Sequence, residues 1–234
     1  MMCAEDAAPT FGFSLRLKEG TRRAHRWIER LTFVRSFLRG VLDGEQYQRL
    51  LVDLYYIYAT LESALVAHQK HPAVAPMVLP QLFRTRCIAA DLDVLASRGI
   101  GRAWRMQPMS QAALLYTQRL RQLSEQRPEL LVAHCYTRYL GDLSGGQILR
   151  RMAGLALGLG SSGGLSYYDF PEVADPAQFK KEFRSRLDAL PLSEAQRADV
   201  IAEAVRAFGL SGALFDVLPT PPRLDKTGIT SARA

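Results

Sequence analysis

A histidine in a basic helical segment is the first candidate for chemistry in this sequence. His25 and Glu29 are four residues apart, so on a helix the carboxylate can engage one ring nitrogen and orient the imidazole. Lys18 lies two turns before His25 on the same face, about 10 Å away along the axis. An iron ligand and an anion-binding ammonium at this separation suit a haem, whose propionates project from one edge. A hydrogen-bonded structural histidine is the alternative.

Glycines interrupt the longest helical pattern of the chain, which spans residues 128–157 and is predicted to be one helix. Each of Gly141, Gly145 and Gly146 costs roughly 1 kcal/mol relative to alanine in a helix interior. Gly141 and Gly145 share a face, which therefore carries no side chains, and a flat ligand or another backbone can approach it. The pattern predicts the wall of a ligand site, with a kink or close helix packing as the alternative.

Polar residues flank this bare face and favour the ligand wall. Arg138 and Asp142 are four residues apart and are expected to pair on the helix. Residues 143–147 read LSGGQ, the signature of ATP-binding-cassette ATPases, but the chain lacks a GxxxxGK[ST] loop and has almost no strand pattern. An ATPase is therefore not expected.

Composition indicates one helical domain in a reducing compartment. The chain has 234 residues, and its three cysteines lack the spacing of a disulfide framework or a zinc site. Neither a signal peptide nor a run of 18 apolar residues is found, so we expect a soluble, cytoplasmic protein without a membrane partner. The net charge of +7 could attract an anionic ligand or an acidic protein, but the dispersed basic residues do not favour nucleic acid.

Helical periodicity extends over most of the chain. Residues 1–11 are expected to be a flexible N-terminus, 12–217 the domain, and 218–234 a disordered tail. Capping residues Ser110, Asp175 and Ser193 are expected to begin three of the helices. The predicted helices are 12–30, 44–70, 81–97, 111–125, 128–157, 176–190 and 194–217. Together they predict an all-α, single-domain fold.

Four segments resemble the haem oxygenase family. YTRYLGDLSGGQ at 136–147 closely resembles its distal-helix signature, and three other matches are LKEGTRRAH at 17–25, LYYIYATLE at 54–62 and FKKEFRSRL at 179–187. The likeness covers roughly residues 12–217. It implies a helical bundle that holds haem between the first, or proximal, helix and a kinked, glycine-rich distal helix.

The resemblance also implies roles for individual residues. His25 is then the proximal iron ligand, and Glu29 is its orienting neighbour. Asp142 holds a distal water network with help from Tyr58 and Arg138. These three residues and the wall glycines Gly141 and Gly145 are the implied catalytic residues. The further contacts that the resemblance implies are Lys18, Tyr136, Thr137, Gly141, Ser144, Gly145, Lys180, Arg184 and Phe208.

The implied activity is the oxidative cleavage of haem b, which is both cofactor and substrate, to biliverdin, CO and ferrous iron. It requires O₂ and external electrons, from a donor such as a ferredoxin, a flavodoxin or a flavin reductase, and its product could pass to a biliverdin acceptor. By this resemblance, the positions that determine which edge of the haem is cleaved match the pattern for cleavage at the α-meso carbon. The polar tail resembles soluble bacterial members of the family.

Two other functions fit parts of the sequence. A protein that carries haem without degrading it would use the same His25 and basic residues but has no purpose for Asp142. A thiaminase-like enzyme of the same fold would need a nucleophile, and Cys135 has no obvious activating base. His134 lies eight residues before Asp142 and is interpreted as structural, while Gly209 and Gly212 are expected to interrupt the last helix near Phe208.

Overall fold

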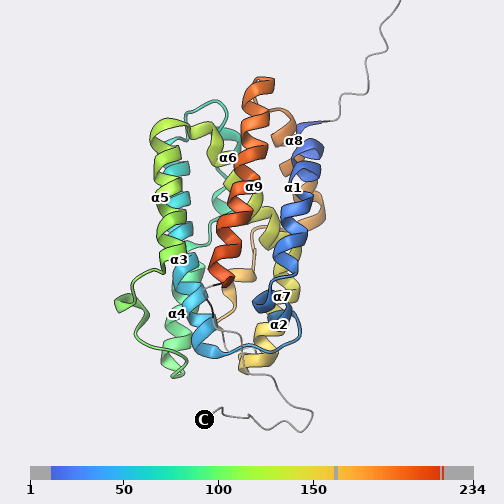
Figure 1. The fold of residues 1–234 in the computed structure, drawn as a ribbon. Helices are drawn as coiled ribbons and strands as arrows, with labels where there is room; N and C mark the ends of the chain where they lie inside the picture. Colours follow the sequence, from blue (N-terminus) through green and yellow to red (C-terminus); the bar gives the residue numbers. More distant parts are fainter. Residues whose placement is uncertain (1–11, 161–162, 217, 219–234) are drawn as a thin grey trace, which may run out of the picture.

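Helices make up the regular structure of the computed structural model, which describes residues 12–160, 163–216 and 218 (Figure 1). The first half contains α1 (Phe13–Glu29), α2 (Thr32–Leu38), α3 (Gly44–Ala67), η1 (Ala75–Met77), η2 (Pro80–Leu82), α4 (Thr85–Ser97) and η3 (Trp104–Met106). The second half contains α5 (Gln111–Gln126), η4 (Pro128–Leu130), α6 (Leu131–Cys135), η5 (Tyr136–Leu140), α7 (Gly141–Leu157), η6 (Ser166–Tyr168), α8 (Pro176–Asp188) and α9 (Glu194–Asp216). No strand occurs among the described residues, so the predicted all-α fold is confirmed.

Helix α9 joins the two sides of the bundle. It packs against α1 on one side and against α5 and α6 on the other (Figure 1). Helix α8 lies along the start of α1, while α2 packs against α7. The first helix and the 136–157 segment, which carry the predicted site residues, are thus held on a common frame.

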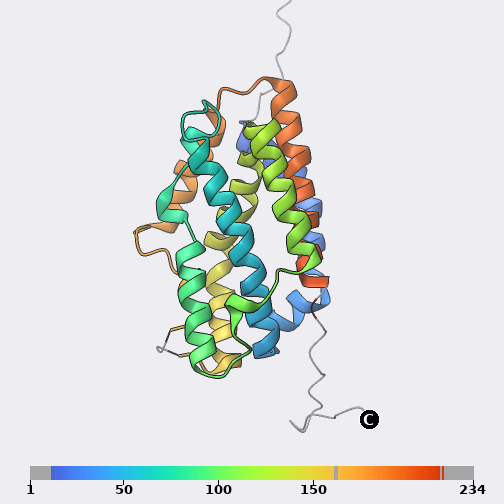
Figure 2. The same ribbon diagram turned by 90° about the vertical axis from the view of Figure 1, so that its left-hand side faces the viewer.

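Helix α3 runs between α4 and α5, as Figure 2 shows from the side. By length and composition it could cross a membrane, but 61% of its most apolar window is buried inside the protein. Its large side chains, among them Tyr47, Ile57 and Tyr58, are fully buried in the core. This burial fits the core helix of a soluble protein.

Predicted capping residues begin three helices. Ser110 accepts a hydrogen bond from the Ala113 N–H, and Asp175 accepts from the backbone at the start of α8. Ser193 and Gln196 bond reciprocally, because the Ser193 N–H donates to the Gln196 side chain and the Ser193 hydroxyl accepts from the Gln196 N–H. These caps fix where the site-bearing helices α8 and α9 begin.

The prediction of one regular helix over residues 128–157 is wrong, because several helical pieces of different kinds follow one another there. Pro128 opens a short 3₁₀ turn, α6 comes next, and Tyr136–Leu140 forms a π-helical turn directly before Gly141. A π turn inserts an extra residue into the helical ladder and rotates the next stretch of helix. The kink expected at the glycines therefore begins one turn earlier, and α7 ends at Gly158 in the left-handed conformation (φ 62°).

Other boundaries differ in smaller ways. Helix α2 was not predicted, and the helix predicted from residue 81 begins at Thr85, after the η2 turn that Pro80 opens. The expected interruption of the last helix is also wrong, because α9 continues to Asp216. At Gly212 a Cβ atom would lie 2.3 Å from the Trp27 ring, so this glycine allows α1 and α9 to pack closely. The predicted flexible segments 1–11 and 219–234 lie outside the described residues, whereas Leu218 is described and buried.

Candidate functional site

The proximal side of the site is an exposed face of α1. Helical spacing brings Nδ1 of His25 to 3.5 Å from a carboxylate oxygen of Glu29. The imidazole also meets the Phe208 ring of α9 edge to face, with the ring centroids 5.7 Å apart. With Nδ1 engaged by Glu29, Nε2 is the nitrogen available to ligate an iron. Both His25 and Glu29 remain more than half exposed.

One end of the site gathers polar and basic groups from three elements. The Tyr136 hydroxyl of η5 lies 3.4 Å from the Thr21 hydroxyl of α1. Burial raises the pKa of Tyr136, and the positive charge of Arg184 on α8 partly opposes that rise. The structure thus brings Arg184 near Tyr136, one helical turn from Lys180, whose carbonyl accepts from the Arg184 side chain at 3.4 Å. Lys18 is exposed on α1, one turn before residue 21.

A carboxylate that sequence reasoning missed holds α8 against α1. Asp188 accepts from the Ser14 N–H at 2.6 Å and from the Ser14 hydroxyl at 3.0 Å. These bonds satisfy a free backbone donor in the first turn of α1. They fix the end of α8 beside the start of α1, and so fix the relative positions of the basic residues on the two helices.

The distal wall is formed by the bare glycine face of α7. An ideal Cβ built at Gly141 or at Gly145 would meet no heavy atom within 4 Å. Gly146, on another face, would place its Cβ 3.4 Å from the Tyr168 ring, in ordinary packing contact. The alternative of close helix packing therefore does not account for Gly141 and Gly145, while an open surface for a flat ligand does.

Asp142 lies buried beside this wall, with a phenol on each carboxylate oxygen. Tyr58 of α3 donates a short hydrogen bond to Oδ2, and Tyr167 of η6 donates to Oδ1 at 2.7 Å. The two hydroxyls are 3.4 Å from each other. Burial raises the pKa of Asp142, and Arg138 together with the two hydrogen bonds opposes the rise.

Arg138 is joined to Asp142 by hydrogen bonds through Tyr58. The predicted direct pair is wrong, because no ion pair within 4 Å joins Arg138 to Asp142 in the described part of the chain. Its guanidinium instead donates to the Tyr58 hydroxyl and to the Ser211 hydroxyl, each at 3.3 Å. Arg138 lies inside the π turn, which ends at Leu140 and changes the spacing on which the prediction depended.

Three other predicted contacts lie in different surroundings. Thr137 is buried and its hydroxyl donates to the Ala133 carbonyl at 2.8 Å. Ser144 is exposed on α7 between the two wall glycines, and Phe208 contacts the proximal imidazole. The direct roles of these residues toward a ligand stay predictions.

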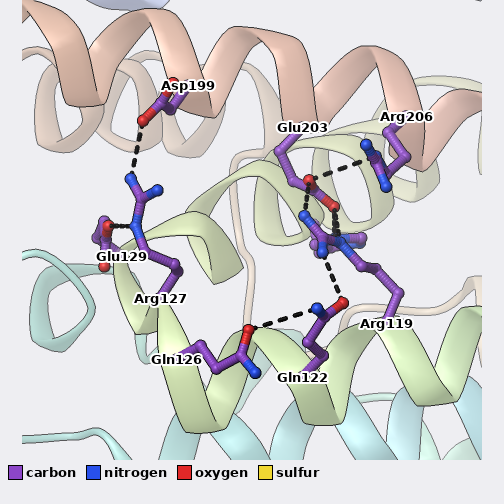
Figure 3. A network of polar contacts seen from close by, with 9 residues as sticks. Arg119, Gln122, Gln126, Arg127, Glu129, Asp199, Glu203 and Arg206 are labelled. Carbon is purple, nitrogen blue, oxygen red and sulfur yellow. Dashed lines mark hydrogen bonds and ion pairs between the residues drawn. The ribbon is translucent and has the colours of Figure 1, made fainter.

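His134 has a structural environment, as its position suggested. It is fully buried, and its ring nitrogens face the Tyr116 hydroxyl at 3.1 Å and Glu203 at 3.2 Å. Glu203 of α9 also accepts from Arg119 of α5 at 2.6 and 3.0 Å (Figure 3). Burial opposes ionisation of Glu203, but the bonds from His134 and Arg119 outweigh it and lower its pKa to about 2.

Sequence reasoning missed two side chains of the distal network. Tyr167 is the first of two tyrosines that follow the glycine-rich residues 158–164, and Ser211 lies 73 residues after Arg138. Neither has a local spacing that relates it to Asp142, because the contacts are made through the tertiary fold.

The residues present fit a haem. A flat macrocycle needs an open face, and the glycine wall provides a surface that any larger residue would fill with a Cβ. An imidazole oriented by a carboxylate suits iron, and the cluster of Lys18, Lys180 and Arg184 suits carboxylates. The fold is a helical bundle, and the side chains brought together suit a flat, anionic, metal-bearing ligand.

Comparison with known proteins gives the family. The family model described as Heme oxygenase matches residues 11–216. A heme oxygenase of Pyropia yezoensis is 40% identical over 204 residues, which are 86% of this chain and 84% of that relative. The chain belongs to the haem oxygenase family.

Solved structures of the same family share the fold. The crystal structure of heme oxygenase-1 from Synechocystis, in complex with heme, matches with a TM-score of 0.82 and 36% identity over 88% of this chain and 91% of that one. Heme oxygenase-2 from Synechocystis, in complex with heme and NO, matches with a TM-score of 0.83 and 37% identity, covering 89% and 85% of the two chains.

These matches confirm the predicted family, the helical-bundle fold and the enzyme class, an oxidoreductase that degrades haem to biliverdin. Nothing in them favours the haem carrier or the thiaminase-like enzyme.

Proposed function

We propose that this haem oxygenase binds haem b between α1 and the glycine wall, with His25 as the axial ligand and Asp142 as the residue that directs protons. The observation that carries this proposal is a buried carboxylate, hydrogen-bonded on both oxygens, directly beside the open face of Gly141 and Gly145. A haem carrier has no use for such a group. Bound haem supplies the iron that takes up O₂ and the porphyrin carbon that is oxidised.

Asp142 acts in this proposal without touching the iron. Its oxygens already accept from Tyr58 and Tyr167, and each keeps a lone pair for an ordered water. The Tyr139 hydroxyl is buried without a hydrogen-bond partner among the described residues, and burial, with smaller effects of charges that include Glu62 and Asp142, raises its pKa. A water between these groups satisfies the hydroxyl and places a proton next to the glycine wall.

The basic cluster fixes which edge of the haem faces the reacting oxygen. Arg184 can hold a propionate through two parallel hydrogen bonds, and Lys18 and Lys180 add point charges. Tyr136 contributes a hydroxyl at the same end. In this orientation cleavage falls at the α-meso carbon.

An acidic electron donor fits the outer face of α1. Arg22, Arg23, Arg26 and Arg30 line a surface cavity of about 510 Å³ together with Trp27, on the helix that carries His25. Such a patch attracts a negatively charged protein such as a ferredoxin, a flavodoxin or an acidic flavin reductase. The proposed location is the cytoplasm, where reduced donors and a biliverdin acceptor are available.

The donor proposal has a matched test. Charge reversal of Arg22 and Arg23 to Glu should slow turnover driven by an acidic ferredoxin and leave turnover driven by a small chemical reductant unchanged. Arg121→Glu, on the exposed face of α5, is the control and should affect neither. Donor-driven turnover that does not weaken as salt rises would contradict steering by this patch.

The function itself is tested by reconstitution. The chain is loaded with haem, supplied with a reductant in air, and followed by its absorption spectrum with assays for biliverdin and CO. Loss of the haem spectrum with stoichiometric biliverdin and CO is the expected result. An unchanged haem spectrum would indicate a carrier.

A further inference from the structure

Tyr167 touches the carboxylate on which the proposed reaction depends. Its hydroxyl donates to one oxygen of Asp142 at 2.7 Å, while Tyr58 donates to the other. All three side chains are buried. Because each oxygen has its own phenol, the carboxylate cannot rotate without losing a hydrogen bond in a buried environment, which is costly.

A buried carboxylate fixes the backbone that carries Tyr167. Asp91 of α4 accepts from the Tyr167 N–H at 2.7 Å, and from the N–H and the hydroxyl of Ser166 at 2.8 and 2.7 Å. Burial raises the pKa of Asp91, and these three bonds oppose the rise. A buried carboxylate is thus used to hold a three-residue turn in place.

A buried guanidinium holds the same turn from its other side. Arg84 donates to the backbone carbonyls of Tyr167 and Asp169, and its guanidinium lies 4.0 Å above the Phe170 ring. Glu62 of α3 in turn accepts from the Arg84 N–H at 2.5 Å. Glu62 is one helical turn after residue 58. Helix α3 therefore carries one phenol on Asp142 and, through Glu62 and Arg84, also anchors the turn that carries the other.

We infer that Tyr167 is a positioning residue for the reaction, which together with Tyr58 holds the Asp142 carboxylate ionised and in one orientation. A phenol that donates to a carboxylate stabilises its ionised form, and a single phenol would leave one oxygen free to turn. An ionised, oriented carboxylate can hold a water in a fixed position by accepting a hydrogen bond from it. The inference rests on the proposed role of Asp142 and adds to it a residue from the 165–170 segment.

The first test needs no haem. In the apo chain labelled with ¹³C-aspartate, the Asp142 carboxyl signal is assigned by its loss in Asp142→Asn and is titrated with pH. The groups that face Asp142 are Tyr58 of α3, Arg138 and Tyr139 of η5, Tyr167 and Tyr168 of η6, and Arg84 before α4. In Tyr167→Phe the pKa of Asp142 should rise by roughly one pH unit, because one hydrogen bond to the ionised form is lost.

Tyr168→Phe is the matched control. It removes a hydroxyl from the next residue, whose side chain makes no hydrogen bond to Asp142 among the described residues, since the phenols that donate to Asp142 are those of Tyr58 and Tyr167. This variant should leave the titration of Asp142 unchanged. An identical Asp142 titration in Tyr167→Phe and in the unmodified chain would overturn the inference, whatever the activity.

The second test uses the haem-loaded enzyme. Tyr167→Phe should bind haem with unchanged affinity and turn over several-fold more slowly, while Tyr168→Phe keeps its rate. A raised pKa with unchanged turnover would also overturn the inference, because the hydroxyl would then have no part in the reaction. Failure of the proposed function is separate: it would appear as full biliverdin yield from Asp142→Ala.

Discussion

On α1, the residues proposed to hold the haem are separated by one and two helical turns, and they remain exposed on a regular helix. Around Asp142, by contrast, the partners come from α3, η5, η6 and α9, and all are buried. The proximal side is thus built by local periodicity, while the distal side is built by tertiary contacts. The proposed roles account for the difference, since an axial ligand needs access to a large ligand and a proton-directing carboxylate needs a fixed, buried environment.

The largest effect is expected from a substitution on the proximal side. His25→Ala should abolish reductant-driven turnover and leave the helical content unchanged, because the His25 side chain is more than half exposed and meets Phe208 edge to face. Absorption spectra of the haem-loaded variant should lose the signature of an axial imidazole. His71→Ala, in a loop outside the site, serves as the control. An imidazole signature that persists in His25→Ala would assign the ligand to another residue.

The next largest effect is expected from a substitution on the distal side that leaves the proximal side intact. Asp142→Ala should bind haem as the unmodified chain does but lose about 10²-fold or more of its rate of biliverdin formation, the usual range for a lost acid–base group. Asp142→Asn should retain more, to the extent that an amide can still hold the water. Biliverdin and CO are measured for both variants. Unchanged yields from Asp142→Ala would remove this residue from the mechanism.

The same contrast explains what the sequence could predict. His25, Glu29 and Lys18 lie on one helix, so spacing alone brought them together, and the structure places His25 and Glu29 as expected. The bare face of Gly141 and Gly145 could likewise be predicted from the sequence, because it depends on two residues four apart. The identification of Asp142 and Tyr58 came from a family resemblance, and the structure joins them directly.

The remainder of the distal side required tertiary information. The π turn at Tyr136–Leu140 has no distinct sequence pattern, and it replaced the expected Arg138–Asp142 pair with bonds to Tyr58 and Ser211. Tyr167 reaches the site from a turn that Asp91 and Arg84 bond to through its backbone. Such contacts join residues with no fixed separation along the chain, so periodicity cannot reveal them.

A third prediction sharpens the comparison through the pH dependence of the free energy of unfolding. Glu203 lies behind the distal side, where it bonds to His134 and Arg119 (Figure 3). Because its pKa is lowered from 4.5 to about 2 in the folded chain, its contribution is present above pH 4.5 and is lost as pH falls toward 2. Glu203→Gln should lower the free energy of unfolding at neutral pH by about 2–3 kcal/mol and should lose less stability than the unmodified chain between these pH values.

Denaturant unfolding at several pH values measures this effect. Glu125→Gln, which removes a charge from the exposed face of α5, is the control and should change stability by less than about 0.5 kcal/mol. Parallel pH profiles of the free energy of unfolding for Glu203→Gln and the unmodified chain would show that Glu203 does not cause the loss of stability in acid. The proximal variants, whose side chains are exposed, should leave the profile unchanged.

The smallest expected effect concerns which product forms rather than how much, and it tests whether the exposed side controls orientation. Lys180→Ala with Arg184→Ala removes two cations from one face of α8 and leaves Lys18 and Tyr136 to hold the propionates. Haem should still bind through His25, but its in-plane orientation should relax, and the biliverdin should become a mixture of isomers. Chromatography of the product measures the isomer ratio, and Lys181→Ala on the neighbouring face of α8 is the control that should keep one isomer. The loss should be partial, because the glycine wall still restricts the face of the ring on which oxygen reacts. A single unchanged isomer from the double variant would assign orientation to the shape of the buried distal side, and the division between a proximal side that orients and a distal side that reacts would then be wrong.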